Sequence, residues 1–123
     1  VVAAIGFTAL AIWPKTLYLL VWLLPILMVT GLQSLTEKPA LVLDIEAGDW
    51  RRVWTLAVSG LICGLFWEMW NVTSLAHWQY SVPYVQRFEI FEMPLLGYLG
   101  YLPFGIFCGL FADFILPSSL KSS

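Results

Sequence analysis

The most informative part of this sequence begins with Phe66-Trp67-Glu68-Met69-Trp70-Asn71 and ends with Leu95-Leu96-Gly97-Tyr98-Leu99-Gly100-Tyr101-Leu102-Pro103-Phe104. Two more glutamates, Glu89 and Glu92, stand between these runs. Three carboxyl groups and an asparagine amide are thus gathered among aromatic residues, in a chain that is otherwise nearly all apolar. Any chemistry that the protein performs is therefore expected in this part of the chain.

The composition indicates an integral membrane protein. Of the 123 residues, 60% are hydrophobic and 11% are charged, whereas soluble domains carry about 25% charged residues. A chain this apolar cannot cover a water-facing surface, so a lipid bilayer is its expected solvent. Seven residues are tryptophan, which collects at the headgroup level of membranes. The net charge of −2 does not suggest nucleic acid as a partner.

The apolar runs predict an all-α fold, a polytopic transmembrane helical bundle that forms a single domain over residues 1–123. Val1–Trp13 reaches only about 20 Å as a helix, short of a hydrocarbon core of about 30 Å. It is interpreted as a partial N-terminal span, so the chain is expected to be a fragment that lacks its N-terminal part. Three full spans are expected, at Thr16–Leu35, Trp50–Ser74 and Leu95–Leu116. Pro25 should kink the first of them, and Pro103 should interrupt the last.

The segments between the spans are expected at the membrane surface. Thr36–Asp49 is the main polar loop, and Tyr84–Met93 is expected to form a short interfacial helix. Basic residues lie on both sides of the predicted membrane, four (Lys38, Arg51, Arg52, Lys121) against two (Lys15, Arg87). Because cytoplasmic loops carry an excess of basic residues, loop 36–49 and the C-terminus are expected in the cytoplasm.

Two glycine patterns predict close packing of helices. Gly60-Leu61-Ile62-Cys63-Gly64 and Gly105-Ile106-Phe107-Cys108-Gly109 both have glycines four residues apart. In lipid, this spacing lets two helix backbones approach closely. Cys63 and Cys108 lie inside these patterns and lack C-x-x-C spacing, so they are interpreted as small packing residues.

The three glutamates allow two interpretations. Glu68 and Asn71 share a helix face, as do Glu89 and Glu92, and the order of the spans puts all three carboxyl groups at a similar depth. They can be hydrated interfacial groups without a function of their own, and the last two would suit a helix N-terminus. If they face a protein-lined cavity, all three are candidate catalytic residues, because ionisable groups within membrane helices usually mark a pathway or a site.

The candidate ligand-binding residues are Trp67, Glu68, Asn71, His77, Trp78, Glu89 and Glu92. A metal site is not predicted, because di-iron sites in helical bundles use Glu-x-x-His pairs, and here one histidine accompanies Glu-x-x-Glu. No motif requires a cofactor. Lipid, a carotenoid or a chlorophyll-type pigment are the candidate apolar ligands, and His77 is the residue that could hold a pigment. Nucleophile, phosphate-loop and dinucleotide motifs are absent from the sequence.

Three runs carry a resemblance to a known family: Trp67-Glu68-Met69-Trp70-Asn71, Trp78-Gln79-Tyr80-Ser81-Val82-Pro83-Tyr84-Val85 and the run from Phe91 to Phe104. Over roughly residues 30–110 the chain resembles a family of uncharacterised bacterial multi-span membrane proteins. The resemblance implies a multi-pass protein of the bacterial inner (cytoplasmic) membrane, of which this chain is the C-terminal part, and it carries over no activity. Family members often have a glutamate soon after the Pro-Phe pair, whereas Gly105-Ile106-Phe107 follows here, so no acidic site is carried over at that point.

The sequence leads to one main hypothesis and two alternatives. The main hypothesis is a non-enzymatic integral membrane subunit that packs against other membrane protein subunits and binds lipid or a pigment-like apolar ligand. The first alternative is a membrane enzyme that performs acid–base chemistry on an isoprenoid- or carotenoid-type substrate through Glu68, Glu89 and Glu92. The second alternative, part of a proton or solute pathway, depends on the same acids and on the interrupted last span.

Overall fold

The computed structural model describes residues 1–18, 20–80 and 88–116, which are mostly helical, as the apolar runs predict. The helices are α1 (Val2–Ile12), α2 (Pro14–Leu17), α3 (Leu20–Gln33), α4 (Ala40–Glu46), α5 (Arg51–Thr73), the 3-10 helix η1 (Leu95–Gly100) and α6 (Tyr101–Ile115). Two short strands, β1 (Glu89–Ile90) and β2 (Met93–Pro94), pair in the antiparallel sense.

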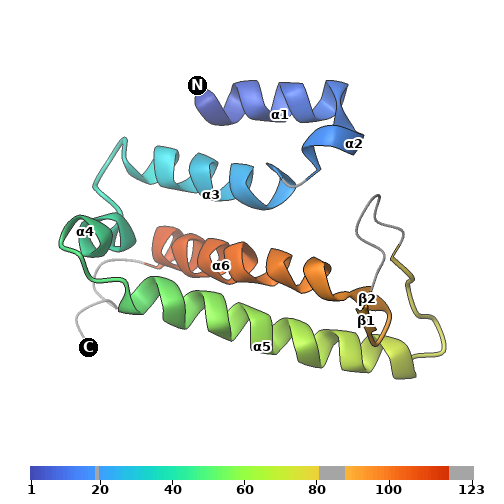
Figure 1. Cartoon of the computed structure of the whole chain (residues 1–123). Helices are drawn as coiled ribbons and strands as arrows, with labels where there is room; N and C mark the ends of the chain where they lie inside the picture. The colour runs from blue at the N-terminus through green and yellow to red at the C-terminus, as the bar shows by residue number, and fades with distance from the viewer. Residues whose placement is uncertain (19, 81–87, 117–123) are drawn as a thin grey trace.

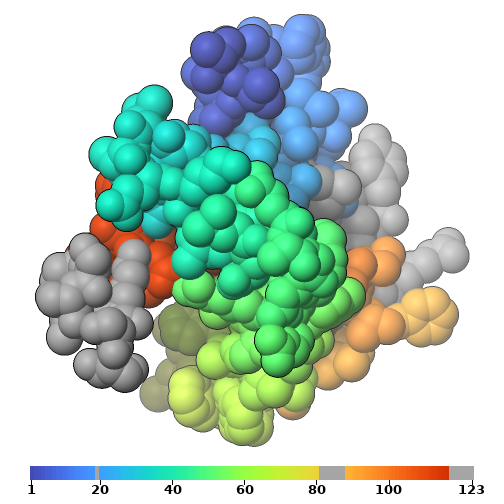
Figure 2. Space-filling model, turned by 90° about the vertical axis from the view of Figure 1, so that its left-hand side faces the viewer, coloured from blue at the N-terminus to red at the C-terminus, as the bar shows by residue number. Residues whose placement is uncertain are grey.

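The longer helices pack in series, in the order α1, α3, α6, α5 (Figure 1). Helix α4 covers one end of the molecule, between α3 and the start of α5 (Figure 2), and β1 and β2 lie at the opposite end. A small core of Val29, Leu41 and Leu110 joins α3, α4 and α6. Because each helix packs mainly against its neighbours in the series, much of its surface stays uncovered by protein.

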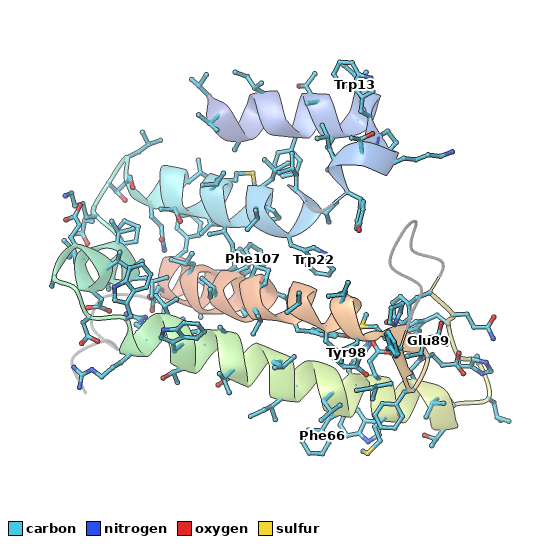
Figure 3. All side chains as sticks on the ribbon, viewed as in Figure 1. Trp13, Trp22, Phe66, Glu89, Tyr98 and Phe107 are labelled. Carbon is cyan, nitrogen blue, oxygen red and sulfur yellow. The ribbon has the colours of Figure 1, made fainter. Side chains whose placement is uncertain are left out.

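Two helical segments are long and apolar enough to cross a membrane, Arg51–Thr73 with 23 residues and Leu95–Ile115 with 21. They correspond to the predicted spans Trp50–Ser74 and Leu95–Leu116. Only 17% and 22% of the residues in their apolar windows are buried inside the protein, whereas the core helix of a soluble protein is mostly buried. Large apolar side chains therefore point outward, such as Phe66, which is 50% exposed (Figure 3).

The predicted span Thr16–Leu35 does not form one long helix. Helix α2 ends at Leu17, and α3 has 14 residues, which is a rise of about 21 Å. Helix α3 continues through Pro25, the expected kink position. Helices α1 and α3 are apolar but fall short of the length of a full span, so three full spans are not seen in the part of the chain that the structure describes.

The predicted interfacial helix Tyr84–Met93 is wrong over its described part. Residues 84–87 lie outside the described residues, and the rest forms β1 and its turn toward β2. Phe88 and Phe91 have φ angles of 55° and 57°, a left-handed conformation that a right-handed helix cannot contain. Helix α4, in contrast, forms inside the predicted polar loop Thr36–Asp49.

The last predicted span changes its helix type along its length. Its first six residues form η1, and the α-helical part begins at Tyr101. Pro103 is the third residue of α6, and the first turn of an α-helix tolerates proline. The expected interruption is therefore a change from 3-10 to α-helix just before Pro103.

Candidate functional site

Helices α5 and α6 meet through their glycine patterns. A Cβ atom on Gly60 would lie 2.7 Å from the Cα of Gly105 and 2.5 Å from the carbonyl oxygen of Tyr101. A Cβ atom on Gly64 would lie 2.3 Å from the ring of Tyr101. Side chains cannot be placed at such distances without a shift of the neighbouring atoms, so the missing Cβ atoms are what allow this approach. Gly109 also lies against α5, so the four predicted packing glycines all lie at the α5–α6 seam.

An apolar groove of about 500 Å³ follows this seam. It is lined by Leu56, Ser59, Gly60, Cys63, Gly64 and Trp67 of α5 and by Tyr101, Phe104, Gly105, Cys108 and Gly109 of α6. Among the described residues, no charged side chain lines it. Cys63 and Cys108 are exposed free thiols on its walls rather than buried packing residues.

Glu68 is buried beside the end of this groove, with an exposed fraction of 0%. Its Oε1 accepts a hydrogen bond of 2.6 Å from the hydroxyl of Tyr80 and one of 2.7 Å from the hydroxyl of Tyr101, which also lines the groove. Its Oε2 is equally buried and has no hydrogen-bond partner among the described residues. A buried polar atom without a partner costs about 1–3 kcal/mol, so this oxygen is a candidate contact for a ligand.

The side chain of Asn71 connects the segment that follows α5 to the helix by hydrogen bonds. We name residues 74–80 the strap. The Nδ2 of Asn71 donates to the carbonyl of Trp78 at 2.9 Å, and its Oδ1 accepts the backbone N–H of Trp78 at 3.0 Å. The indole N–H of Trp78 donates to the hydroxyl of Tyr80 at 2.6 Å, and its ring lies 5.5 Å from that of Trp67. These contacts fix the hydroxyl that binds the buried carboxyl group.

Tyr80 acts as a neutral hydrogen-bond donor in this arrangement. Burial, followed by the hydrogen bond to Glu68, raises the pKa of Tyr80 from 10.0 to about 12. The phenol therefore keeps its proton throughout the physiological pH range and donates it to the carboxyl oxygen. Sequence reasoning did not single out Tyr80, because no helix periodicity relates the strap to α5.

Three predicted site residues, His77, Glu89 and Glu92, are more exposed than the buried carboxyl group. His77 is exposed in the strap, Glu89 is exposed in β1, and Glu92 is partly exposed in the turn between the strands. Figure 3 shows Glu89 near Tyr98, at the same end of the molecule. Within the described ranges none of these three hydrogen-bonds to Glu68, and no three His, Cys, Asp or Glu side chains are placed to hold a metal ion.

A second polar cluster lies at the opposite end of the seam and was not predicted as a site. Arg52 at the start of α5 forms an ion pair with Asp113 near the end of α6 and lies 3.9 Å from Asp44 of α4. The buried Gln33 donates to the carbonyl of Leu110 at 3.0 Å. The sequence offered one signal for this cluster. Arg52 and Asp113 have opposite charges, and they stand at the ends of two predicted spans that adjoin when the spans are antiparallel. These contacts connect α3, α4, α5 and α6 at this end of the molecule.

Comparisons with protein-family models, with curated proteins and with solved structures gave no match to this chain. The resemblance to a bacterial membrane protein family therefore stays a prediction. What can be said of function comes from the groove and from the buried carboxyl group beside it.

Proposed function

We propose that this chain is part of a non-enzymatic, multi-pass protein of the bacterial inner membrane, and that its α5–α6 groove binds the apolar chain of a lipid. Two helices are long enough to span a membrane, and large apolar side chains on them face outward. Both features support a hydrocarbon environment around the protein. In this arrangement α1 and α3 lie in the membrane beside them. The excess of basic residues near loop 36–49 supports a cytoplasmic position for that loop and for the C-terminus.

The apolar groove is the observation that carries the proposal. Its volume of about 500 Å³ lies within the range of about 300–1,000 Å³ that small-molecule sites occupy. Its lining runs along α5 from Leu56 to Trp67, a rise of about 17 Å. A long, narrow and uncharged space of this kind suits an extended hydrocarbon chain better than a compact polar ligand.

Other membrane protein subunits are the expected partners of the outer surface. Trp54 and Trp70, on α5, are 64% and 62% exposed. Aromatic residues are enriched where proteins associate, so α5 is the helix that we expect to contact a neighbouring subunit. Cross-linking from position 54 or 70 in native membranes tests this assignment, and cross-links to lipid alone would contradict it.

Filling the groove tests the lipid-binding function. Cys63→Trp puts a large ring on the wall of the groove, while Ile62→Trp changes the adjacent residue, which is 51% exposed and does not line the groove. Each protein is purified in mild detergent, its melting temperature is measured, and bound lipid is identified by native mass spectrometry. We expect lipid on the wild type and on Ile62→Trp, and little on Cys63→Trp. A folded Cys63→Trp protein that retains the wild-type amount would refute the proposal.

Acid–base chemistry on an apolar substrate is the second candidate function, and Glu68 is the observation in its favour. This carboxyl group is buried, has one oxygen without a partner in the described structure, and is hydrogen-bonded to Tyr101 on the wall of the groove. A positioned carboxyl group can transfer a proton to or from a bound substrate. Glu68→Gln should then abolish turnover of an isoprenoid substrate while lipid still binds, and unchanged turnover would eliminate this function.

A further inference from the structure

We propose that the groove selects an uncharged, single-chain lipid that ends in a hydroxyl group, and that this hydroxyl lies at the end formed by Glu68 and Tyr101. The inference rests on the proposed lipid-binding function and names the class of lipid. It follows from the charges at the two ends of the groove and from the hydrogen bonds at one of them.

The groove offers nothing to neutralise an anionic headgroup. The side chains with a polar group on its described walls are neutral, namely those of Ser59, Cys63, Trp67, Tyr101 and Cys108. A fatty carboxylate or a phosphate would therefore lose its hydration without gaining a counter-charge, which is costly in an apolar site. Beyond the Leu56 end, Arg52 is already paired with Asp113 and lies close to Asp44, so two carboxylates already oppose its one positive charge.

The opposite end offers hydrogen-bonding capacity to a neutral group. The ring of Tyr101 forms part of the wall, and its hydroxyl lies 2.7 Å from Oε1 of Glu68. Glu68 itself does not line the groove, and its Oε2 is buried without a hydrogen-bond partner among the described residues. A ligand hydroxyl is both a donor and an acceptor, so it can pair with the tyrosine oxygen, beside this carboxyl group, without bringing a charge into the groove.

A carboxylate at the same place would lose its hydration, and no cationic side chain on the described lining would compensate for that loss. An ammonium group would lose its hydration in the same way, because the carboxyl group of Glu68 is fully buried and is not part of the lining. A prenyl alcohol or a long-chain alcohol meets neither penalty. These are the ligand classes that the charges and hydrogen bonds favour.

The native thiols of the groove provide the assay. Cys63 and Cys108 are free and line the groove, so a bound chain should slow their alkylation by an apolar thiol reagent in detergent. The probes are farnesol, farnesoic acid and farnesylamine, which share one chain and differ in the end group. As a control, a protein whose two native cysteines are replaced by alanine and that carries Ile62→Cys should be alkylated at the same rate with and without farnesol.

We expect farnesol to protect the thiols at a concentration about tenfold lower than either charged analogue, the ratio that one well-placed hydrogen bond provides. Tyr101→Phe should remove this preference, and Glu68→Leu should weaken it, because the tyrosine hydroxyl then loses its hydrogen-bond partner. Equal protection by all three probes, or stronger protection by the acid or the amine, would overturn the selectivity and leave the lipid-binding groove standing. Protection by none of them would overturn the proposed function itself.

Discussion

Gly60 and Gly105 meet so closely that a Cβ atom on the first would lie 2.7 Å from the Cα atom of the second. This contact joins the two helices of spanning length at the middle of their seam. It also brings the thiols of Cys63 and Cys108 and the ring of Tyr101 onto the walls of one groove. The position of the groove and the packing of the two helices therefore depend on the same small residues.

Substitution of Gly105 by alanine should loosen this seam. The added Cβ atom would lie 2.2 Å from the carbonyl oxygen of Leu56, so the helices must move apart, and overpacking of this kind costs about 1–3 kcal/mol. Gly31→Ala is the control, because nothing lies within 4 Å of its added Cβ atom, and alanine favours a helix by up to about 1 kcal/mol. Thermal unfolding in detergent measures both. A melting temperature of Gly105→Ala that matches or exceeds that of the control would show that the seam tolerates a methyl group.

The partly buried phenol of Tyr80 should make stability depend on alkaline pH. Its pKa is about 12 in the folded protein, against about 10 for a free tyrosine. Because the folded state holds the proton more tightly, this contribution is complete below about pH 10 and is lost as the pH rises through about 12. The melting temperature of the wild type should fall more steeply over this interval than that of Tyr80→Phe. Parallel curves would mean that the phenol is not held against the carboxyl group.

Removal of the Asn71 amide should release the strap. Asn71→Leu keeps a side chain of similar size but deletes both hydrogen bonds to Trp78, and each is worth about 0.5–1.5 kcal/mol. We expect faster amide exchange in residues 74–80, measured by hydrogen–deuterium mass spectrometry. In Thr73→Val, the matched control, the lost hydroxyl bonds only to carbonyl groups of its own helix. If both variants exchange at the wild-type rate, Asn71 does not hold the strap.

The ion pair between Arg52 and Asp113, at the end of the seam opposite Glu68, should contribute more to stability than the surface pair between Arg51 and Asp49. Arg52 joins α5 to α6 through Asp113, whereas Arg51 is largely exposed and binds the nearby Asp49. Arg52→Gln should lower the free energy of unfolding by on the order of 1 kcal/mol, since the pair is partly exposed and partly screened. Arg51→Gln should have a smaller effect. Thermal melts at low and high salt separate the two, and a larger loss in Arg51→Gln would contradict this assignment.

Local spacing predicted the relative position of two residues of the candidate site. Glu68 and Asn71 are three residues apart, which puts them on one helix face, and both are buried, with exposed fractions of 0% and 3%. Tyr101 had a weaker signal, because it precedes Gly105 by four residues and so shares the glycine face. Tyr80 had none. It reaches Glu68 only because the chain reverses after α5, and side-chain periodicity carries no information about the path of a loop.

The fold was predictable where one apolar pattern runs uninterrupted. The span expected at Trp50–Ser74 differs from α5 by one residue at each end. The region before Pro94 was not predictable in this way, because two-residue strands leave no periodic pattern to read. The left-handed backbone at Phe88 and Phe91 is unusual for aromatic residues and has no sequence signal.

In the proposed membrane setting, the unequal lengths of the helices would affect the surrounding lipid. Helix α5 has 23 residues and α3 has 14, which are rises of about 35 Å and 21 Å. Lipids beside α5 would meet an apolar wall at least as tall as an ordinary hydrocarbon core, while those beside α3 would meet a wall about two fifths shorter than that of α5. Hydrophobic mismatch of this kind is relieved by tilting of the protein or by local thinning of the bilayer. The α1–α3 side is therefore where we expect this protein to deform its membrane.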